Sequence, residues 1–206
     1  AAWQQSPHAV AVNSGSSANL ALIQALLNLG LLSRGDEVGF SALTWSTNPM
    51  PLFQLGLTPV GIDVELDNLC VSLRTLQDTV ARHPSLKCLF ITNLLGFCAD
   101  LDAIAAFCSD HNILLIEDNC QSLGSIHHGR KLGNYGIAST FSTFVGHHLS
   151  TVEGGVVCTA DDDLMDAILL ARAHGWNRNL SEQKRNALRQ EHNVNSFSDP
   201  YTFYDL

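Results

Sequence analysis

The chain has 206 residues, of which 46% are hydrophobic and only 15% are charged. This length and composition are typical of one globular domain with a sizeable core, and they exclude a disordered tail. The formal net charge of −9 disfavours a general binder of the nucleic-acid backbone, so we expect no nucleic-acid partner.

The cysteines and the apolar runs indicate the compartment. Six cysteines are scattered through the sequence without CxxC spacing, and several lie inside apolar runs. This is the usage of buried free thiols in a reducing compartment, and it favours neither a disulfide framework nor a zinc site. No apolar run reaches membrane-spanning length. We therefore expect a cytoplasmic protein with no membrane partner.

The first predicted unit is a strand, a turn of small residues and a helix. These fall at residues 9–12, 13–17 and 18–29. Free N–H groups and the positive end of the helix dipole meet at such a helix start, which favours a phosphate. An ordinary serine cap is the alternative, but one glycine and two further serines follow Ser14. The segment is neither GxGxxG nor GxxxxGK[ST], so neither a dinucleotide nor a nucleoside triphosphate is indicated.

Short apolar strands then alternate with helices. Strands are predicted at residues 35–40, 58–64, 88–93 and 113–118, and helices at 50–55, 72–82, 100–111, 161–173 and 181–192. This alternation predicts an α/β domain with a mainly parallel sheet between helix layers, an αβα sandwich. Residues 193–206 are expected to be loop-like.

Four polar features follow strands, and ligands of parallel sheets bind at the carboxyl ends of the strands. The features are the turn around Gly15, the loop with Trp45, Asp118 with Gln121, and the loop from Ser142 to His147. We expect them to form a single site. A tryptophan in a loop is, however, more often a plug of the core than a stacking platform.

Asp118 ends a strand that is predicted to be buried, and a carboxylate there has several possible uses. It could bind a metal, act as a base, or cap a helix that begins near Cys120. It could also face a protonated ring nitrogen and keep that nitrogen cationic as an electron sink. The residues alone leave these alternatives open.

Residues 141–155 predict a functional loop between two strands. A β-prone run breaks at Gly146, two adjacent histidines follow, and the loop closes with Glu-Gly-Gly. Neighbouring side chains of an extended chain point to opposite faces, so only one of His147 and His148 is expected to face a given pocket. A polar loop with incidental histidines is the alternative. A metal site on both is disfavoured, because adjacent residues rarely chelate one ion.

Four motifs occur together in an order that matches a known family. They are Ser14–Asn19, Gly35–Val38, Glu117–Gln121, and Ser142 with His147 and Glu153–Gly155. On these motifs the chain resembles the PLP-dependent sugar aminotransferases of the DegT/DnrJ/EryC1/StrS group over nearly its whole length. The resemblance implies that residues 1–206 are the cofactor-binding large domain of a fold-type-I PLP-dependent transferase. It also implies a homodimer with a shared active site. The chain starts without methionine and stops after an aromatic segment, so we expect a fragment that lacks an N-terminal segment and a C-terminal small domain.

The resemblance also implies roles for individual residues. The phosphate of pyridoxal 5′-phosphate (PLP) or pyridoxamine 5′-phosphate (PMP) would be held by Gly15, Ser16, Ser17 and Ser142. Trp45 would stack on the pyridine ring, Asp118 would pair with the ring nitrogen, and Gln121 would lie near the ring hydroxyl.

The chain departs from the family at the Schiff-base lysine. The aminotransferases carry that lysine six residues before the Glu of Glu-Gly-Gly, and here this position is His147. The only lysines are Lys87, Lys131 and Lys184, so the cofactor would rest as PMP or free PLP. Histidine retains the capacity to move protons near neutral pH. This replacement implies catalysis by His147 in one of the family's 3-dehydratases, which remove the C3 hydroxyl of nucleotide-linked 4-keto-6-deoxy sugars.

One kind of 3-dehydratase has a [2Fe–2S] cluster and clustered cysteines beyond the region of His174, where this chain has no cysteine. The chain is more similar to the iron-free kind, which acts on GDP-4-keto-6-deoxy-D-mannose in colitose biosynthesis. Residues 146–151, 174–176 and 201–204 carry this similarity, whereas Gln121 replaces a usual acid. The implied partners are a nucleotide-sugar substrate and an amino donor such as glutamate. A true aminotransferase and an inactive cofactor- or sugar-binding homologue are the alternatives.

Overall fold

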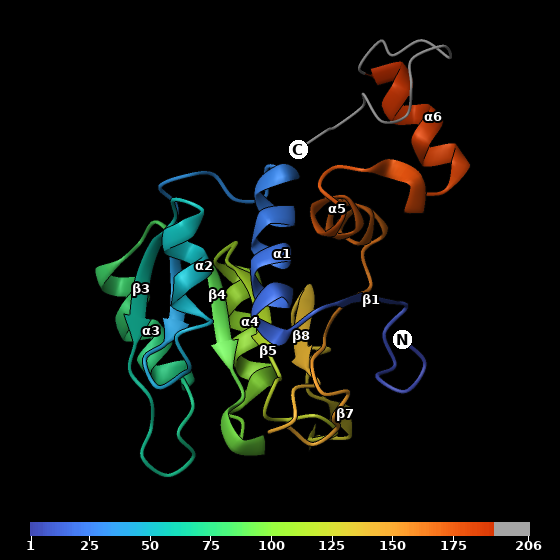
Figure 1. Cartoon of the computed structure of the whole chain (residues 1–206). Coiled ribbons are helices and arrows are strands. Elements are labelled where there is room, and N and C mark those ends of the chain that lie inside the picture. The colour runs from blue at the N-terminus through green and yellow to red at the C-terminus, as the bar shows by residue number, and fades with distance from the viewer. Residues whose placement is uncertain (192–206) are drawn as a thin grey trace.

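A seven-stranded sheet forms the centre of the computed structural model, which describes residues 1–191 (Figure 1). The strand order is β1-β9-β8-β5-β4-β2-β3. The strands are β1 (His8–Val12), β2 (Glu37–Ser41), β3 (Thr58–Ile62), β4 (Leu86–Thr92), β5 (Leu114–Asp118), β8 (Ala138–Ser142) and β9 (Gly155–Thr159). A separate hairpin consists of β6 (Ile126–His127) and β7 (Arg130–Lys131).

Helices connect the strands and cover both faces of the sheet. They are α1 (Gly15–Asn28), α2 (Pro49–Gln54), α3 (Leu73–Arg82), α4 (Leu101–Asp110), α5 (Asp162–Arg172) and α6 (Glu182–Glu191), with short 3₁₀ turns η1 (Leu94–Gly96) and η2 (Asn177–Asn179). Two separate hydrophobic clusters lie against the sheet. One contains side chains of α1, α2 and α5, and the other contains side chains of α3 and α4.

Strand β4 shows why the central strands are apolar throughout. Phe90 packs into the cluster under α1, and its neighbour Leu89 packs into the cluster under α3 and α4. Successive side chains of a strand point to opposite faces, so a strand covered on both faces must be apolar at every position. The predicted αβα sandwich is confirmed.

The sheet is mainly parallel, as predicted. Strands β3, β2, β4, β5 and β8 form parallel pairs, and β9 is antiparallel to both β8 and β1. Helices α2, α3 and α4 join successive parallel strands from β2 to β5, the β6–β7 hairpin lies in the connection from β5 to β8, and residues 143–154 lead directly from β8 back into β9. The loop with the two histidines therefore projects from the end of a hairpin.

Two local predictions differ from the structure. Helix α1 begins at Gly15, three residues earlier than predicted, because the Ser14 hydroxyl caps it by accepting the N–H of Ser17 at 3.0 Å. No helix begins near Cys120, where residues 119–125 form turns. Asp118 Oδ1 instead accepts the N–H of Cys120 at 2.9 Å, in a local Asx-type turn. The alternative in which Asp118 caps a helix is therefore wrong.

Adjacent carboxylates end β5 and have separate tasks. Glu117 is fully buried and accepts the N–H groups of Gly133, Tyr135 and Gly136 at 2.7, 2.7 and 3.0 Å. This carboxylate anchors the connection that leads into β8. Asp118 is the next residue of the strand, and its side chain points to the opposite face.

Near the end of the described region, α6 spans most of the helix predicted at residues 181–192. The predictions for residues 193–206, including the 201–204 motif, lie outside the described residues. Among residues 1–191, no helix has both the length and the apolar character that crossing a membrane requires.

Candidate active site

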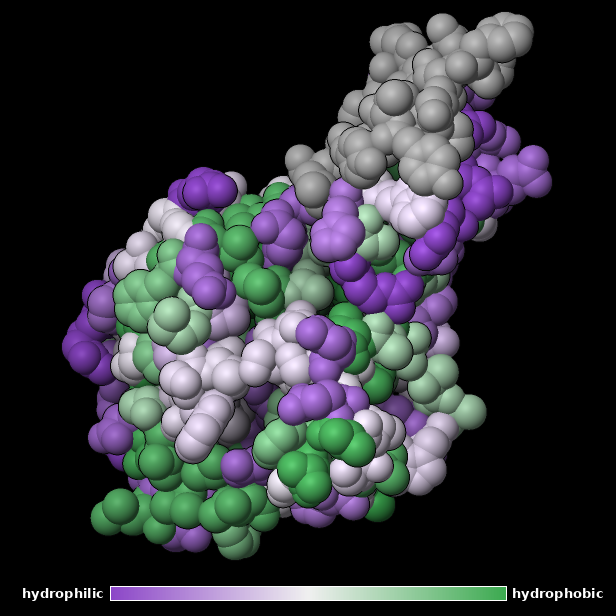
Figure 2. Space-filling view, in the orientation of Figure 1, coloured by the Kyte–Doolittle hydropathy of each residue, from purple (hydrophilic) through white to green (hydrophobic). Residues whose placement is uncertain are grey.

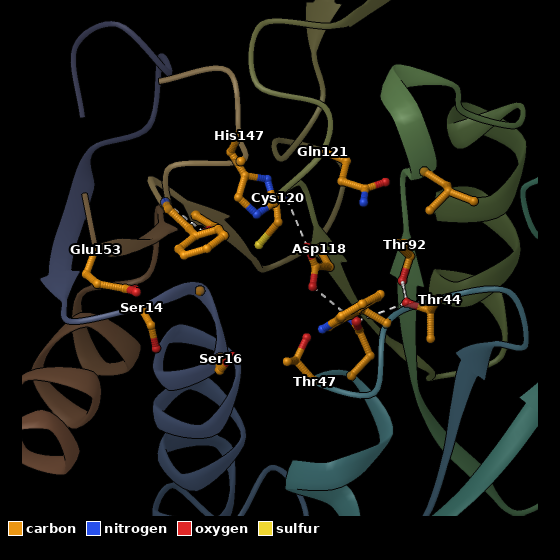
Figure 3. Close-up of a pocket in the computed structure, with 17 residues that line it drawn as sticks. Ser14, Ser16, Thr44, Thr47, Thr92, Asp118, Cys120, Gln121, His147 and Glu153 are labelled. Atoms are coloured by element: carbon orange, nitrogen blue, oxygen red, sulfur yellow. Dashed lines mark hydrogen bonds between the residues drawn. The ribbon is translucent and has the colours of Figure 1, made fainter. Parts of the chain in front are cut away.

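A cavity of about 370 Å³ lies at the carboxyl edge of the sheet (Figure 3). Its lining includes side chains at or just beyond the ends of β1, β2, β4, β5 and β8. Seven of the eight residues predicted for the site line it: Gly15, Ser16, Trp45, Asp118, Gln121, Ser142 and His147. Segments far apart in the sequence thus converge at one cavity. The sequence predicted this convergence, because the four polar features all follow strands.

The N-terminus of α1 forms one wall of the cavity. The N–H groups of Gly15 and Ser16 have no partner inside the helix, because they lie in its first turn. Ser142 lies against this turn, and a Cβ atom on Gly15 would be only 2.7 Å from the Ser142 Cβ. The Ser142 hydroxyl accepts the N–H of Phe144 at 3.2 Å, which leaves its own hydrogen for donation. This arrangement suits a phosphate.

Ser17 is the one predicted residue that does not line this cavity. Its hydroxyl accepts a hydrogen bond from Ser14 at 3.0 Å, and its N–H is bound to the same Ser14 oxygen. Both groups therefore serve the cap of α1. Their placement gives no support to the expected phosphate contact by Ser17.

Asp118 is a buried carboxylate surrounded by neutral donors. It is 4% exposed, and its Oδ2 accepts the side-chain amides of Asn19 and Asn48 at 3.0 and 2.8 Å. With the N–H of Cys120 on Oδ1, three of its roughly four acceptor positions are used. No ion pair among residues 1–191 includes Asp118. Buried carboxylates are usually paired, so this one fits a cationic N–H donor supplied from the cavity.

The two asparagines were not predicted as site residues. Asn19 is one turn beyond Gly15 in α1, so helical spacing places it on the same side of the helix. Asn48 belongs to the Trp45 loop and is oriented by Thr44, whose hydroxyl donates to its Oδ1 at 2.9 Å. The Thr44 and Thr92 hydroxyl oxygens are 2.7 Å apart. Polarity within the Ser14–Asn19 and Trp45 segments was the available signal, but pairing with Asp118 requires the tertiary fold.

His147 is the histidine that faces the cavity. Figure 3 shows its ring directed inward, on the side of Cys120 and Asp118. The backbone N–H of His147 donates to the Phe144 carbonyl at 2.9 Å. The rings of His147 and Phe144 meet edge to face, with centroids 6.3 Å apart. His148 is exposed and does not line the cavity. The structure therefore brings only one of the two histidines into the site.

The loop that carries His147 is held by contacts across it. The hydroxyl oxygens of Thr143 and Thr151 are 2.7 Å apart, and the N–H of Val145 donates to the Val152 carbonyl. At its base, a Cβ atom on Gly155 would lie 2.1 Å from the Ser14 carbonyl oxygen. Only glycine allows the start of β9 to lie this close to the cap of α1. Glu153, from the same Glu-Gly-Gly segment, also lines the cavity.

The remaining lining residues differ in chemistry. The Trp45 side chain does not pack in the hydrophobic core, because the residue is 72% exposed. Gln121 Oε1 accepts the N–H of Leu95, which ties this side chain to η1. Burial, and then the nearby Asp118 carboxylate, raise the pKa of the Cys120 thiol well above its usual range. This thiol stays protonated at neutral pH, which makes it a poor nucleophile and a poor metal ligand.

The sequence matches the model of the DegT/DnrJ/EryC1/StrS aminotransferase family over residues 1–196. It is 38% identical over 200 residues to the GDP-4-keto-6-deoxy-D-mannose 3-dehydratase of Yersinia pseudotuberculosis, covering 96% of this chain and 50% of the relative. Two solved structures of GDP-4-keto-6-deoxymannose-3-dehydratase, one from E. coli with hydrated PLP and one with a trapped PLP-glutamate geminal diamine, are similar. Each has a TM-score of 0.83 and 38% identity, covering 87% of this chain and 46% of that chain.

These matches confirm the resemblance that the four motifs indicated. They also show that the chain spans about half the length of the relatives it matches.

Proposed function

The chain belongs to the DegT/DnrJ/EryC1/StrS aminotransferase family, and we propose that it is the cofactor-binding large domain of a PLP- or PMP-dependent 3-dehydratase. The enzyme would remove the C3 hydroxyl of a nucleotide-linked 4-keto-6-deoxyhexose. One observation carries the proposal: His147 replaces the family's lysine and faces the cavity, and no lysine from residues 1–191 lines that cavity.

The residues of the cavity fit the cofactor. The first turn of α1 and the Ser142 hydroxyl would hold the phosphate. The uncompensated carboxylate of Asp118 would accept the protonated ring nitrogen, and Trp45 would cover the ring. Gln121 would lie near the ring hydroxyl. Bound PLP or PMP supplies the electron sink that the protein's own side chains lack.

The protein's share of the chemistry is binding and proton transfer. The His147 imidazole would take up one proton and deliver one to the departing C3 hydroxyl of the sugar. Asp118 would keep the proton on the ring nitrogen throughout, because its other donors are neutral amides. The hairpin contacts of residues 143–154 would hold the imidazole toward the cavity.

The names of the relatives guide the choice of substrates. The Yersinia relative is named for GDP-4-keto-6-deoxy-D-mannose, and one structural relative holds a PLP-glutamate adduct. We extend this to a GDP-linked 4-keto-6-deoxyhexose and to glutamate as amino donor, in a cytoplasmic deoxysugar pathway of lipopolysaccharide O-antigen.

A homodimer with a shared site is part of the proposal. Hydrophobic surface gathers near the end of the molecule toward which the strand arrows point (Figures 1 and 2). The exposed apolar residues next to the cavity include Trp45, at 72%, and Phe144, at 43%. A second subunit that covers this rim would exclude water from the cavity.

An aminotransferase is the alternative that the family description favours. It would need an amine within reach of the cofactor, and His147 supplies none. An inactive homologue is less favoured, because Asp118 and the turn proposed to hold the phosphate both line the cavity.

Absorbance spectra test the proposal. PLP is added to the protein, then glutamate, with and without borohydride reduction. Conversion of a free-PLP band to a PMP band, without pyridoxyl label on the protein, supports it. The His147→Lys variant restores an amine and serves as the positive control for labelling. Covalent label on the unmodified protein would overturn the proposal in favour of an aminotransferase. Release of the 3-deoxy sugar from the nucleotide-linked ketosugar then completes the test.

A further inference from the structure

A cluster of possible metal ligands lies outside the active-site cavity. Asp102, in the first turn of α4, meets His127 and His128 of the β6–β7 hairpin. One ligand atom from each residue lies within 4.8 Å of the others. None of the three lines the cavity described above. The family resemblance and the proposed function assign them no role.

The turn of the hairpin explains how adjacent histidines converge. Neighbouring side chains in a strand point apart. Here His128 and Gly129 have φ angles of +47° and +82°, and they form the two-residue turn between β6 and β7. Positive φ at both central residues is the geometry of a type I′ turn. The two imidazole rings come together as a result, with centroids 3.9 Å apart and planes inclined by 30°.

The distances suit a shared ion. His128 Nδ1 is 2.8 Å from Asp102 Oδ2, and His127 Nε2 is 3.6 Å from the same oxygen. Ligands bound to one tetrahedral zinc ion at about 2.0–2.2 Å lie roughly 3.3 Å from each other. Asp100 Oδ1, at 3.8 Å from His127 Nε2, is in reach as a fourth ligand.

Ion pairs between protonated histidines and Asp102 account for only part of this arrangement. They satisfy His128, but His127 Nε2 is buried and has no hydrogen-bond partner. At 3.6 Å its contact with Asp102 is too long for a hydrogen bond. This ring nitrogen faces two carboxylates without a hydrogen bond to either one, so it is available to bind a metal ion.

The surroundings hold the cluster in place and balance its charge. The Tyr135 hydroxyl donates to the His127 carbonyl at 2.6 Å, which fixes the hairpin. The Arg130 guanidinium lies over the Tyr135 ring, 4.6 Å from its centroid. The N-terminus of α4 repels cations, and the carboxylates of Asp100 and Asp102 offset this effect.

We propose that Asp102, His127 and His128, with Asp100 in reach, bind a divalent first-row transition metal ion such as Zn²⁺. Imidazole nitrogens with a carboxylate oxygen favour such an ion over Mg²⁺ or Ca²⁺, which prefer oxygen ligands alone. The ion ties the β6–β7 hairpin to the start of α4. Its role is structural, because the cluster is separate from the cavity.

Zinc titration of the full chain tests the site. Protein stripped with chelator is titrated with Zn²⁺ by calorimetry, and bound metal is counted by elemental analysis. The His128→Asn variant removes the ring but keeps a residue that tolerates the left-handed backbone. His111→Asn is the matched control, since His111 is an exposed histidine at the other end of α4. We expect one tight site per chain, weakened more than about tenfold in His128→Asn and unchanged in the control.

Two further readouts separate this site from other metal binding. Co²⁺ bound here should give a visible spectrum without the near-ultraviolet band of a cobalt–thiolate bond. Zn²⁺ should raise the unfolding temperature of the unmodified protein and of His111→Asn, but not of His128→Asn. Thiolate coordination, or equal zinc affinity in His128→Asn and the unmodified chain, would overturn the proposal. Absence of stoichiometric zinc binding would leave only ion pairs at this position and would overturn it as well.

Discussion

The side-chain amide of Asn48 donates to Oδ2 of Asp118 over 2.8 Å, although the two residues are 70 positions apart in the chain. Asn19 donates to the same oxygen from α1. One carboxylate therefore connects the helix whose first turn suits a phosphate, the loop that carries Trp45, and the end of β5. A shift of any one of these elements moves the proposed partner of the ring nitrogen.

Replacement of Asp118 by Asn should impair cofactor chemistry. The substituted side chain has nearly the same shape and can still accept the N–H of Cys120, but its NH₂ group would face the donor amides of Asn19 and Asn48, so circular dichroism is used to check that the variant is folded. The substituted side chain cannot keep a ring nitrogen cationic, because its charge is lost. A hydrogen bond to a charged group is worth about 1.5–3 kcal/mol, so the rate of PLP conversion by glutamate should fall roughly 10–150-fold. Stopped-flow absorbance measures this rate. An unchanged rate would remove Asp118 from the proposed role.

The histidine pair allows a matched test of proton transfer. His147→Asn should lower dehydration of the nucleotide-linked ketosugar by about 10²–10⁴-fold, the usual contribution of a general acid or base. His148→Asn should retain activity close to that of the unmodified protein, because its side chain is exposed outside the cavity. Product formation is followed by mass spectrometry of the sugar. Equal losses in both variants would argue for disruption of the loop instead of removal of a catalytic group.

Gly155→Ala should destabilise the protein at the junction of β9 and α1. The added methyl group would lie 2.1 Å from the Ser14 carbonyl oxygen, so backbone must move. Such overpacking costs about 1–3 kcal/mol of unfolding free energy, measured by urea denaturation. Gly61→Ala in β3 is the control, since its nearest neighbour would be the Phe40 ring at 3.9 Å. A cost at Gly155 no larger than at Gly61 would show that the two segments do not pack this closely.

Glu37 should contribute stability that depends on pH. Hydrogen bonds from Ser85 and then His83 hold the pKa of the Glu37 carboxyl below its ordinary 4.5. Because the pKa of Glu37 is lower in the folded chain than in the unfolded chain, the ionised carboxylate stabilises the fold at pH values above the unfolded-state pKa. This contribution is lost as the pH falls through the folded-state pKa. The Glu37→Gln substitution should therefore lower the free energy of unfolding by about 0.5 kcal/mol near pH 6 and by almost nothing near pH 3. Urea midpoints at each pH measure the difference. The exposed Asp67→Asn is the control, and a cost that grows toward acid would contradict the sign.

Much of the fold follows from patterns along the chain. Apolar runs such as residues 88–92 predicted the buried strands, because a strand covered on both faces has no position for a polar side chain. The beginning of α1 was placed too late, since Ser14 was counted with a turn although its side chain caps the helix. The β6–β7 hairpin was missed because its strands have only two residues each and carry no period-two pattern.

The site was predicted as a set of positions, but its bonding was not. Polar residues after strands placed Asp118 and His147 at one edge of the sheet, and the cavity contains both. The donors from Asn19 and Asn48 to Asp118 depend on how α1 and the Trp45 loop fold against β5. The contact of Ser17 with Ser14 is the serine cap that the sequence offered as the alternative to a phosphate contact.

The loop between β8 and β9 carries the proposed proton-transfer group apart from the elements proposed to hold the cofactor ring and phosphate. Asp118 ends β5 and the first turn of α1 follows β1, whereas His147 lies on the 143–154 loop, which is held by hydrogen bonds across it. A single codon at position 147 can therefore exchange lysine for histidine without disturbing the elements proposed to bind the cofactor. Under the proposed function, exchange of lysine for histidine at this one loop position would change the reaction, while Asp118 and the first turn of α1 keep their places at the cavity.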